Sequence, residues 1–232
     1  MTPRPVVRSS FGPMRYLAPG ISSFVPGIGS GAGGSQTRRV SMTEPRGSTK
    51  ERILNAAWKR LLHGDRARLE DVAADAGVSR QAVYLHFGSR GGLLLALVDH
   101  IDATFGLQER LAEVASEAVP TDRLDAMLRL MADYNGEIHG IAMAFARQAQ
   151  DDPEVRAAFE DRMERRRAGL LRIVKALEQD GRLRTDWTCE EVADILWELG
   201  SPSSFEHLVT ERGWTTERFG DWLLWAARSF LG

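Results

Sequence analysis

Apolar residues recur at helical spacing along most of the chain from residue 49 onward. Between Thr49 and His63 they fall three or four positions apart, with polar residues on the opposite side, which is the pattern of an amphipathic helix. The expected buried side chains are Ile53, Leu54, Trp58 and Leu62. Short helices cannot form a core alone, so this face should pack against the helices that follow it.

Residues 67–90 carry two short apolar patterns separated by a glycine, and they predict helix, tight turn and helix. Gly77 lies where the first pattern ends, at a position that suits the positive φ of a turn. Ser79 is placed to cap the second helix. Val83 should face the core, and small Ala73 should let the two helices cross closely. This layout is typical of a helix-turn-helix that reads DNA.

The rest of the chain also has helical spacing, and no strand pattern is present beyond residue 106. A fourth helix should begin at Ser89 or Arg90. Capping residues, prolines and glycines then divide the remainder. We expect a helix from Pro120, an interruption between Gly136 and Gly140, and a short helix around residues 141–149. A long helix should then begin at Asp152 and Pro153 and end at Gly181. Thr188 should cap the next helix, a kink should follow at Ser201-Pro202, and the last helix should begin at Thr215 or Thr216. The predicted fold class is therefore all-α.

The composition is that of a globular protein whose basic residues are concentrated near its start. The chain has 232 residues, of which 43% are hydrophobic, and a formal net charge of −2. Residues 1–47 hold six basic residues and one acidic residue, residues 48–100 hold eight and six, and residues 101–232 hold sixteen and twenty-five. This division suits a protein whose amino-terminal part contacts nucleic acid, although so small a surplus over residues 48–100 is also ordinary.

The apolar runs are too short for a membrane protein. None approaches the roughly 18 residues that a membrane span needs, and no segment resembles a cleaved signal peptide. The single cysteine, Cys189, cannot form an internal disulfide, which fits a reducing compartment. We therefore expect a cytoplasmic protein without a membrane partner.

Residues 1–47 are rich in glycine and proline, and we expect them to form a disordered tail. The alternative is a basic arm that follows the DNA backbone. Gly29, Gly31 and Gly34 match the G-x-G-x-x-G spacing of dinucleotide sites, but neither a strand nor a helix pattern flanks them, so we interpret the match as chance. Met42 shortly precedes the folded part, and a translation start there is a hypothesis that mass spectrometry of the native protein can test.

Three short motifs within residues 48–105 resemble the tetracycline-repressor (TetR) family of bacterial transcription regulators. They are Asp71-Val72-Ala73, Gly77-Val78-Ser79 and Tyr84-Leu85-His86-Phe87. The resemblance implies a three-helix, helix-turn-helix DNA-binding head, residues 48–92, followed by a larger helical ligand-binding and dimerisation body, residues 93–232. The body resembles the family only in its helical pattern and in the stretch from Gly213 to Arg218 before the last helix.

Two positions depart from the family pattern. Ser89-Arg90-Gly91-Gly92 stands where serine, lysine and glutamate usually begin the fourth helix. Two glycines in a first helical turn cost up to ~1 kcal/mol each relative to alanine, so we predict a pliant joint with fast hydrogen exchange at residues 90–93. Leu69 stands where a small hydroxyl residue commonly caps the second helix, so we do not expect the usual cap there.

The resemblance implies that the second helix of the motif lies in the major groove of DNA. Arg80 has the chemistry for a bidentate contact with guanine, and Gln81 for one with adenine. Tyr84 and His86 suit phosphate contacts, which position the protein without reading sequence. The expected DNA contacts are Thr49, Lys50, Ser79, Arg80, Gln81, Tyr84, His86 and Arg90. The alternative for each is a solvated surface residue.

The resemblance also implies a homodimer on a near-palindromic double-stranded operator, a small-molecule effector and action as a repressor. Helices over about residues 188–211 and 215–231 would form the dimer contact through Trp197, Trp222 and Trp225. The candidate effector-binding residues are Met127, Met131, Tyr134, His139, Phe145 and Trp187. These side chains, with few buried charges among them, favour an apolar effector. The alternative for each residue is ordinary core packing.

Two other classes of protein are alternatives. An enzyme would need a catalytic or metal-binding pattern, but the five histidines lack metal-ligand spacing, and neither G-x-S-x-G nor a phosphate-binding loop is present. Cys189 has no obvious base beside it. We therefore expect no enzymatic activity, no metal and no cofactor. The second alternative is a helix-turn-helix that contacts proteins, and duplex DNA binding that weakens with salt would distinguish it.

Overall fold

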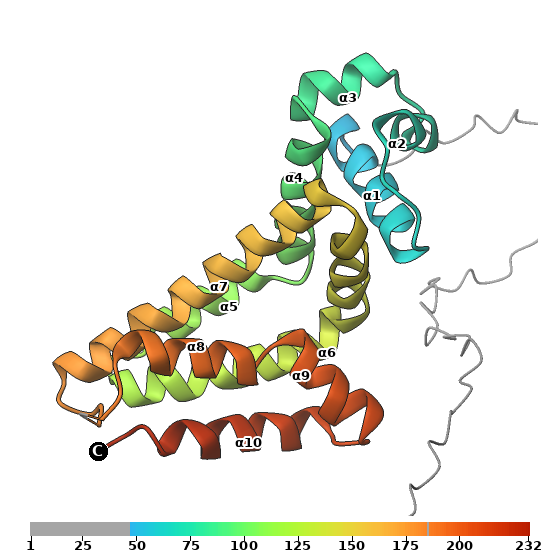
Figure 1. The fold of residues 1–232 in the computed structure, drawn as a ribbon. Coiled ribbons are helices and arrows are strands. Elements are labelled where there is room, and N and C mark those ends of the chain that lie inside the picture. Colours follow the sequence, from blue (N-terminus) through green and yellow to red (C-terminus); the bar gives the residue numbers. More distant parts are fainter. Residues whose placement is uncertain (1–46, 185) are drawn as a thin grey trace, which may run out of the picture. The chain divides into compact units, whose positions relative to one another are not determined.

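Helices make up the part of the chain that the computed structural model describes, residues 47–184 and 186–232, apart from an isolated β-bridge between Leu183 and Leu231 (Figure 1). They are α1 (Thr49–Leu62), α2 (Leu69–Ala76), α3 (Arg80–Phe87), α4 (Arg90–Thr104), α5 (Leu107–Ser116), α6 (Pro120–Asp151), α7 (Pro153–Gln179), α8 (Cys189–Leu199), α9 (Pro202–Phe205), the π-helix η1 (Glu206–Glu211) and α10 (Thr216–Arg228). The predicted all-α fold class is confirmed. Residues 1–46, with nearly all of the predicted tail, the Gly29-Gly31-Gly34 spacing and Met42, lie outside the described residues.

Capping residues and a glycine mark the starts of α1 and α3 and the end of α2. Ser48 caps α1: its hydroxyl accepts a hydrogen bond from the Glu51 N–H, and its own N–H donates to the Glu51 carboxylate. Gly77 ends α2 with a φ of 65°, and Ser79 caps α3 by accepting from the Ala82 N–H. The predicted sequence of helix, turn and helix is therefore confirmed.

One apolar residue of α1 lies off the expected face. Leu62, predicted in the core, is 47% exposed, whereas Leu61 is fully buried. Leu61 lies eight residues after Ile53 and seven after Leu54, which returns it to their side of the helix. Trp58 is partly buried against the same core. The buried face is therefore rotated slightly from the predicted one.

Close packing at the start of α4 explains why one of its two glycines cannot carry a side chain. Ser89 caps the helix by accepting from the Gly92 N–H. A Cβ at position 92 would lie 2.2 Å from the carbonyl oxygen of Phe87, so the backbone leaves no room for a side chain there. A Cβ at Gly91 would meet nothing closer than 3.7 Å. Close approach to the end of α3 therefore requires Gly92 but not Gly91.

Gly92→Ala should lower the free energy of unfolding by about 1–3 kcal/mol, the usual cost of forcing an extra group into packed structure. Gly91→Ala is the matched control, because it adds the same methyl group where there is room. It should raise stability by up to ~1 kcal/mol, since alanine favours a helix. Urea denaturation followed by circular dichroism measures both values. Equal effects of the two substitutions would contradict the steric role of Gly92.

Helix α6 runs unbroken through Gly136 and Gly140, so the predicted interruption is wrong. A glycine costs ~1 kcal/mol relative to alanine in a helix, but Ile141 and Phe145 are buried just beyond, and tertiary packing of this kind supplies most helical stability. Gly136 also has a packing role. A Cβ there would lie 3.3 Å from Oγ1 of Thr216, so glycine lets the start of α10 approach α6 closely.

Most other helices of the body begin where their caps predict. Asp152 caps α7, Thr188 forms a capping box with Glu191 at the start of α8, and Thr215 caps α10. Helix α5 has no counterpart among the predicted elements. It follows Gly106, whose φ of 63° turns the chain after α4.

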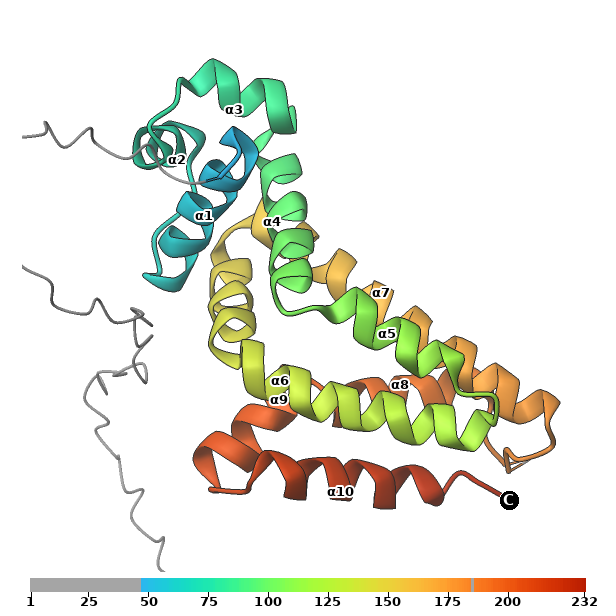
Figure 2. The same ribbon diagram turned by 180° about the vertical axis from the view of Figure 1, so that it is seen from behind.

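Two hydrophobic cores hold the described helices together. The first joins the buried faces of α1–α4 to the end of α6 and the start of α7, through residues such as Phe145 and Val155. The second lies among α5, α6, α7, α8 and α10. Figures 1 and 2 show α4 leading from the first three helices toward α5 and α7, and α10 running beside α6 and α8. The helix-turn-helix therefore shares one core with the end of α6 and the start of α7, and α1 and α4 make the direct contacts with these two helices.

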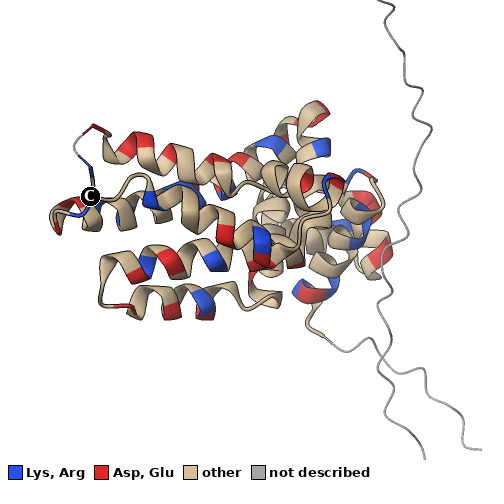
Figure 3. Cartoon of the chain, turned by 90° about the horizontal axis from the view of Figure 1, so that it is seen from below, with Lys and Arg blue, Asp and Glu red and all other residues tan. Residues whose placement is uncertain are grey.

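Acidic and basic residues are interspersed along the described helices (Figure 3). Many form ion pairs between helices, such as Arg110 with Glu137 and Arg167 with Asp194. Exposed pairs of this kind contribute little individually. None of the helices within residues 47–184 and 186–232 is both long and apolar enough to cross a membrane.

Candidate nucleic-acid interface and internal cavity

Helix α3 turns most of its side chains away from the core. Val83 is fully buried, while most of the residues around it are exposed. The exposed side chains at and after its cap are Ser79, Arg80, Gln81, Tyr84, Leu85 and His86. Residues four positions apart are neighbours on a helix surface, which places Arg80 beside Tyr84. A helix that uses so little of its surface for packing is available to a partner.

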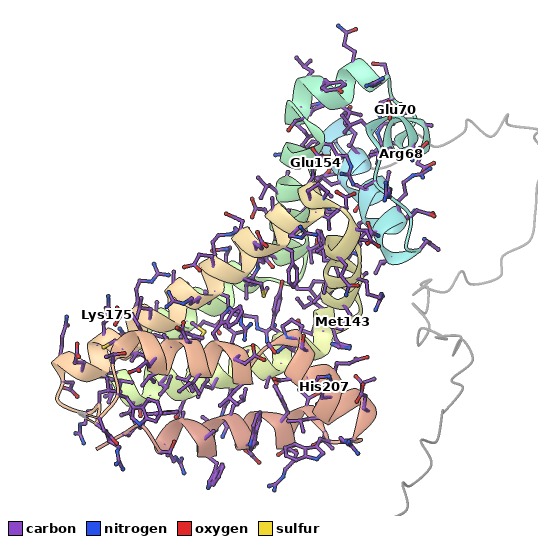
Figure 4. All side chains as sticks on the ribbon, viewed as in Figure 1. Arg68, Glu70, Met143, Glu154, Lys175 and His207 are labelled. Carbon is purple, nitrogen blue, oxygen red and sulfur yellow. The ribbon has the colours of Figure 1, made fainter. Side chains whose placement is uncertain are left out.

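Arg80 is held by surface contacts only. Its guanidinium lies 3.0 Å from a carboxylate oxygen of Glu70 on α2 (Figure 4) and donates a 3.2 Å hydrogen bond to the Tyr84 hydroxyl. The hydrogen bond to Tyr84 and the charge of Glu70 raise the pKa of Arg80 above its ordinary value, so the side chain stays a cation. Both members of the ion pair are more than half exposed. Because exposed pairs are weak, Arg80 can exchange Glu70 for another partner at little cost.

Lys50 and Thr49 lie at the amino-terminal end of α1, where backbone N–H groups favour anions. Lys50 is exposed, and Thr49 is partly buried. Glu51 carries the opposite charge in the same turn, but its carboxylate is bound by Ser48, and these hydrogen bonds lower the pKa of Glu51. The end of α1 therefore presents one exposed cation, Lys50, beside a capped first turn.

Arg90 is engaged inside the protein, which corrects its predicted role as a DNA contact. Its side chain is 15% exposed, and its guanidinium donates hydrogen bonds of 3.0 and 2.7 Å to Asp152 and one of 2.7 Å to Glu154. Its Nε donates to the Ala67 carbonyl at 3.0 Å. The Arg90 guanidinium, with backbone N–H groups of α7, holds the pKa of Asp152 below its usual value. Arg90 therefore ties α4 to the start of α7, where Figure 4 shows Glu154.

Two candidate DNA contacts were not predicted. Leu85 is 85% exposed on α3, although an apolar residue in a helix is normally expected in the core. Arg68 is exposed at the cap position of α2, one residue before Leu69, and makes no side-chain cap there. The helical spacing from Val83 could have placed Leu85 outside the core, but no local pattern points to Arg68 as a DNA contact.

A cavity of about 870 Å³ lies within the body and is lined mainly by α4, α5, α6 and α7. Its size is within the range of small-molecule sites. Four of the predicted effector-binding residues line it, and these are Met127, Met131, Tyr134 and Phe145. All four come from α6, which forms one wall of the cavity.

The other two predicted residues, His139 and Trp187, lie away from the cavity. His139 is hydrogen-bonded to Glu206 in η1. It follows Tyr134 by five residues, and five residues turn a helix by about 140° beyond a full turn, so the two side chains leave α6 in different directions. Trp187 lies between α7 and α8 and packs edge-on against Phe230, with ring centroids 5.5 Å apart. The proposed effector site therefore excludes both.

The cavity wall carries charged residues that the six predicted effector-binding residues do not include. Asp102 on α4 accepts a 2.5 Å hydrogen bond from the Tyr134 hydroxyl and pairs with Arg162 on α7 at 2.9 Å. Burial and the Asp102 carboxylate raise the pKa of Tyr134, so its phenol remains a donor. Arg166 on α7 also lines the cavity. The sequence pattern could not show this grouping, because it depends on three helices far apart in the chain.

The three tryptophans predicted at a dimer contact differ in exposure. Trp197 is partly buried, and its indole N–H donates to the Met163 carbonyl at 3.0 Å. Trp222 is partly buried and packs against Trp214, with ring centroids 6.2 Å apart. Trp225 on α10 is 73% exposed. The packing of a single chain therefore accounts for Trp197 and Trp222 but not for Trp225.

Cys189 is buried at the start of α8, and burial raises the pKa of its thiol to about 11. A nucleophilic cysteine needs the opposite shift, so this thiol is unreactive at neutral pH. Within the described ranges, no three histidine, cysteine, aspartate or glutamate side chains gather as metal ligands.

Residues 53–97, from α1 into α4, match the family model described as bacterial regulatory proteins, tetR family. No curated protein matches the chain at a significant level. Solved structures match over most of its length. A TetR transcription regulator from Haloarcula marismortui is 20% identical, with a TM-score of 0.59 over 79% of this chain and 98% of that one.

Two further structures show the same fold. FadR from Bacillus subtilis, solved in complex with stearoyl-CoA, is 14% identical, with a TM-score of 0.63 over 77% of this chain and 97% of that one. NalD, the secondary repressor of the MexAB-OprM multidrug efflux pump in Pseudomonas aeruginosa, is 21% identical, with a TM-score of 0.58 over 79% and 95%.

The helix-turn-helix, with its outward-facing α3, and the helical body around a cavity form the fold that these solved regulators share. Residues 53–97 match the tetR-family model, and the described chain has the fold of solved TetR-family regulators. The resemblance predicted from the three sequence motifs is confirmed.

Proposed function

We propose that the protein is a DNA-binding transcriptional regulator, a ligand-responsive repressor that binds a palindromic operator as a homodimer. The observation that carries the proposal is the surface of α3, where Arg80, Gln81 and Tyr84 are exposed and leave core packing to Val83. This arrangement supports insertion of α3 into the major groove, which is wide enough to admit a helix.

The side chains on α3 match the chemistry of base edges. Arg80 donates two hydrogen bonds to guanine, Gln81 pairs with adenine, and Leu85 contacts the methyl group of thymine. The residues that hold phosphates on either side, and so position α3 without reading sequence, are Thr49, Lys50, Arg68, Ser79, Tyr84 and His86.

The homodimer forms through α8 and α10. One helix-turn-helix reads few base pairs, so two copies related by a two-fold axis read a near-palindrome. The exposed Trp225 on α10 supports this face, because tryptophan is enriched where protein surfaces are buried. Light scattering of the native protein tests the assembly, and a molar mass of one chain at micromolar concentration would contradict it.

The effector binds in the internal cavity and shifts the DNA-binding heads. Asp102 of α4 and Arg162 of α7 line this cavity, and Arg90 ties the same two helices together beside α3. An effector that moves α4 against α7 therefore changes the position of α3. FadR, which shares the fold, is solved with stearoyl-CoA, and this supports a small-molecule site in such a body.

Binding of duplex DNA at several salt concentrations tests the proposal against its alternatives. The logarithm of the affinity should fall linearly with the logarithm of the salt concentration, because basic side chains release counterions from the phosphates. An enzyme or a protein-interaction module would show no such binding. Genomic footprinting with the purified protein would supply the operator for the specific measurements.

Arg80→Ala should weaken operator binding by about tenfold or more and reduce the preference for the operator over random duplex, because a bidentate base contact is lost. Lys50→Ala is the control: it should weaken binding to both duplexes alike and lower the salt slope by about one. Fluorescence anisotropy at fixed salt measures these affinities. Full retention of specificity in Arg80→Ala would exclude the base contact.

A further inference from the structure

Arg166 brings an uncompensated positive charge to the cavity. Its side chain is partly buried on α7, and its Nη2 donates a 2.8 Å hydrogen bond to the Trp197 carbonyl. Its Nη1 is shielded from solvent and has no hydrogen-bond partner among the residues that the structure describes. A buried ionised donor without a partner is costly. A residue in this state points to a ligand that completes its hydrogen bonds.

The charges around Arg166 do not neutralise it. Burial and the neighbouring cation of Arg162 lower the pKa of Arg166 to about 9, with Glu198 opposing the shift. Asp102 is the acidic residue in the cavity wall, and it is already occupied: Oδ1 accepts from Tyr134, and Oδ2 pairs with Arg162. Arg166 therefore stays charged at neutral pH in a site that lacks a matching anion.

Two other arginines of the wall are engaged by protein groups, and a third, Arg172, is exposed to solvent. Arg123 donates to the Glu117 carbonyl, and Arg165 pairs with Asp99 at 2.8 Å. Most of the remaining lining is apolar, including Met127, Leu130, Met131, Ile138, Phe145 and Phe159. The cavity thus combines a long apolar wall with a buried cationic donor, Nη1 of Arg166, that has no partner among the described residues.

We propose that the cavity binds an amphipathic anion, an apolar chain with a small carboxylate or phosphate head group that accepts a hydrogen bond from Nη1 of Arg166. This deepens the proposed function, because it assigns a chemical class to the effector of the same cavity. A neutral oxygen can accept the hydrogen bond of Nη1 but leaves the charge of Arg166 without a counter-ion, and a cation would meet Arg166 with both oxygens of Asp102 already committed. An anion pairs the guanidinium, and such charge-assisted hydrogen bonds are the strong ones.

Four ten-carbon probes that differ in the head group test the proposal: decanoate, monodecyl phosphate, decanol and decyltrimethylammonium. Isothermal titration calorimetry on the full chain, below micelle-forming concentrations, should give at least one of the two anions an affinity about tenfold or more above that of decanol, about 1.4 kcal/mol. The better anion identifies the head group. Decanol or the cation binding as tightly as both anions would overturn the proposal.

The substitution Arg166→Met tests whether Arg166 causes the preference for an anionic head group. It should lower the affinity for the better anion by about tenfold or more and leave the affinity for decanol unchanged, because methionine keeps the apolar volume and removes the donor. Arg166→Lys should restore part of the preference. Arg167→Met, which removes the same charge from the adjacent position of α7 outside the cavity, is the control and should bind the anion like the native chain. An anion preference that survives in Arg166→Met would overturn the assignment.

These measurements use no DNA, so their failure is distinguishable from failure of the proposed function. If the chain binds an anionic probe but no duplex DNA, only the proposed function as a DNA-binding regulator is contradicted. A chain that binds its operator but prefers decanol would contradict only the anionic effector. If Arg166→Met does not fold, the native head-group series decides alone.

Discussion

Arg90→Met should lower the free energy of unfolding by about 3 kcal/mol, the lower end of the range for removing one partner of a buried ion pair. The substitution leaves the carboxylate of Asp152 without the guanidinium that now binds both of its oxygens, and this carboxylate is 9% exposed. It also leaves the Ala67 carbonyl without its donor. Urea denaturation of the native chain and the variant measures the difference.

Glu154→Gln provides the matched control for this prediction. It changes the other acidic partner of Arg90, which is 46% exposed, and exposed pairs typically contribute less than about 1 kcal/mol. The two substitutions therefore separate the enclosed contact with Asp152 from the solvated one. Equal small losses from both would show that Arg90 is an ordinary surface residue.

The Arg90 contact also predicts how stability changes with pH. Because Arg90 holds the pKa of Asp152 below its usual 3.8, the pair contributes fully above that value and is lost as the pH falls through the lower pKa of the folded state. The native chain should therefore lose stability below about pH 4 more steeply than Arg90→Met. Parallel curves for the two proteins would show that Asp152 does not titrate against Arg90.

Local features of the fold were predictable because they depend on neighbouring residues. The caps at Ser79 and Thr188 and the turn at Gly77 each involve groups within a few positions, so the sequence contains the whole interaction. The exposed face of α3 followed in the same way from helical spacing around Val83. The predicted site residues on this face are accordingly found together.

Interactions between distant segments were not predictable by the same reasoning. The sequence predicts Arg90 as a DNA contact at a helix start, because its partner Asp152 lies 62 residues away and the local pattern does not show it. Gly136 looked like a break in a helix, because the approach of Thr216 that it permits comes from α10. The pliant joint expected at residues 90–93 remains a prediction, but the structure gives Gly92 a steric role and fixes Arg90 to α7.

Asp102→Ala should lower the free energy of unfolding by about 3–5 kcal/mol, because it leaves Arg162 as an unpaired, largely buried cation. It also removes the acceptor of the Tyr134 hydroxyl, so contacts among α4, α6 and α7 are lost together. Calorimetric or urea unfolding measures the loss.

Tyr134→Phe separates the two parts of this cluster. It removes only the hydrogen bond to Asp102 and keeps its ion pair with Arg162, so the expected loss is about 1.5–3 kcal/mol, the usual contribution of a hydrogen bond to a charged group. If Asp102→Ala were no more destabilising than Tyr134→Phe, the ion pair would contribute nothing. Helices α4 and α7 would then be joined by Arg90, by the exposed pair of Arg165 with Asp99 and by their apolar contacts, and an effector in the cavity would have to act through those.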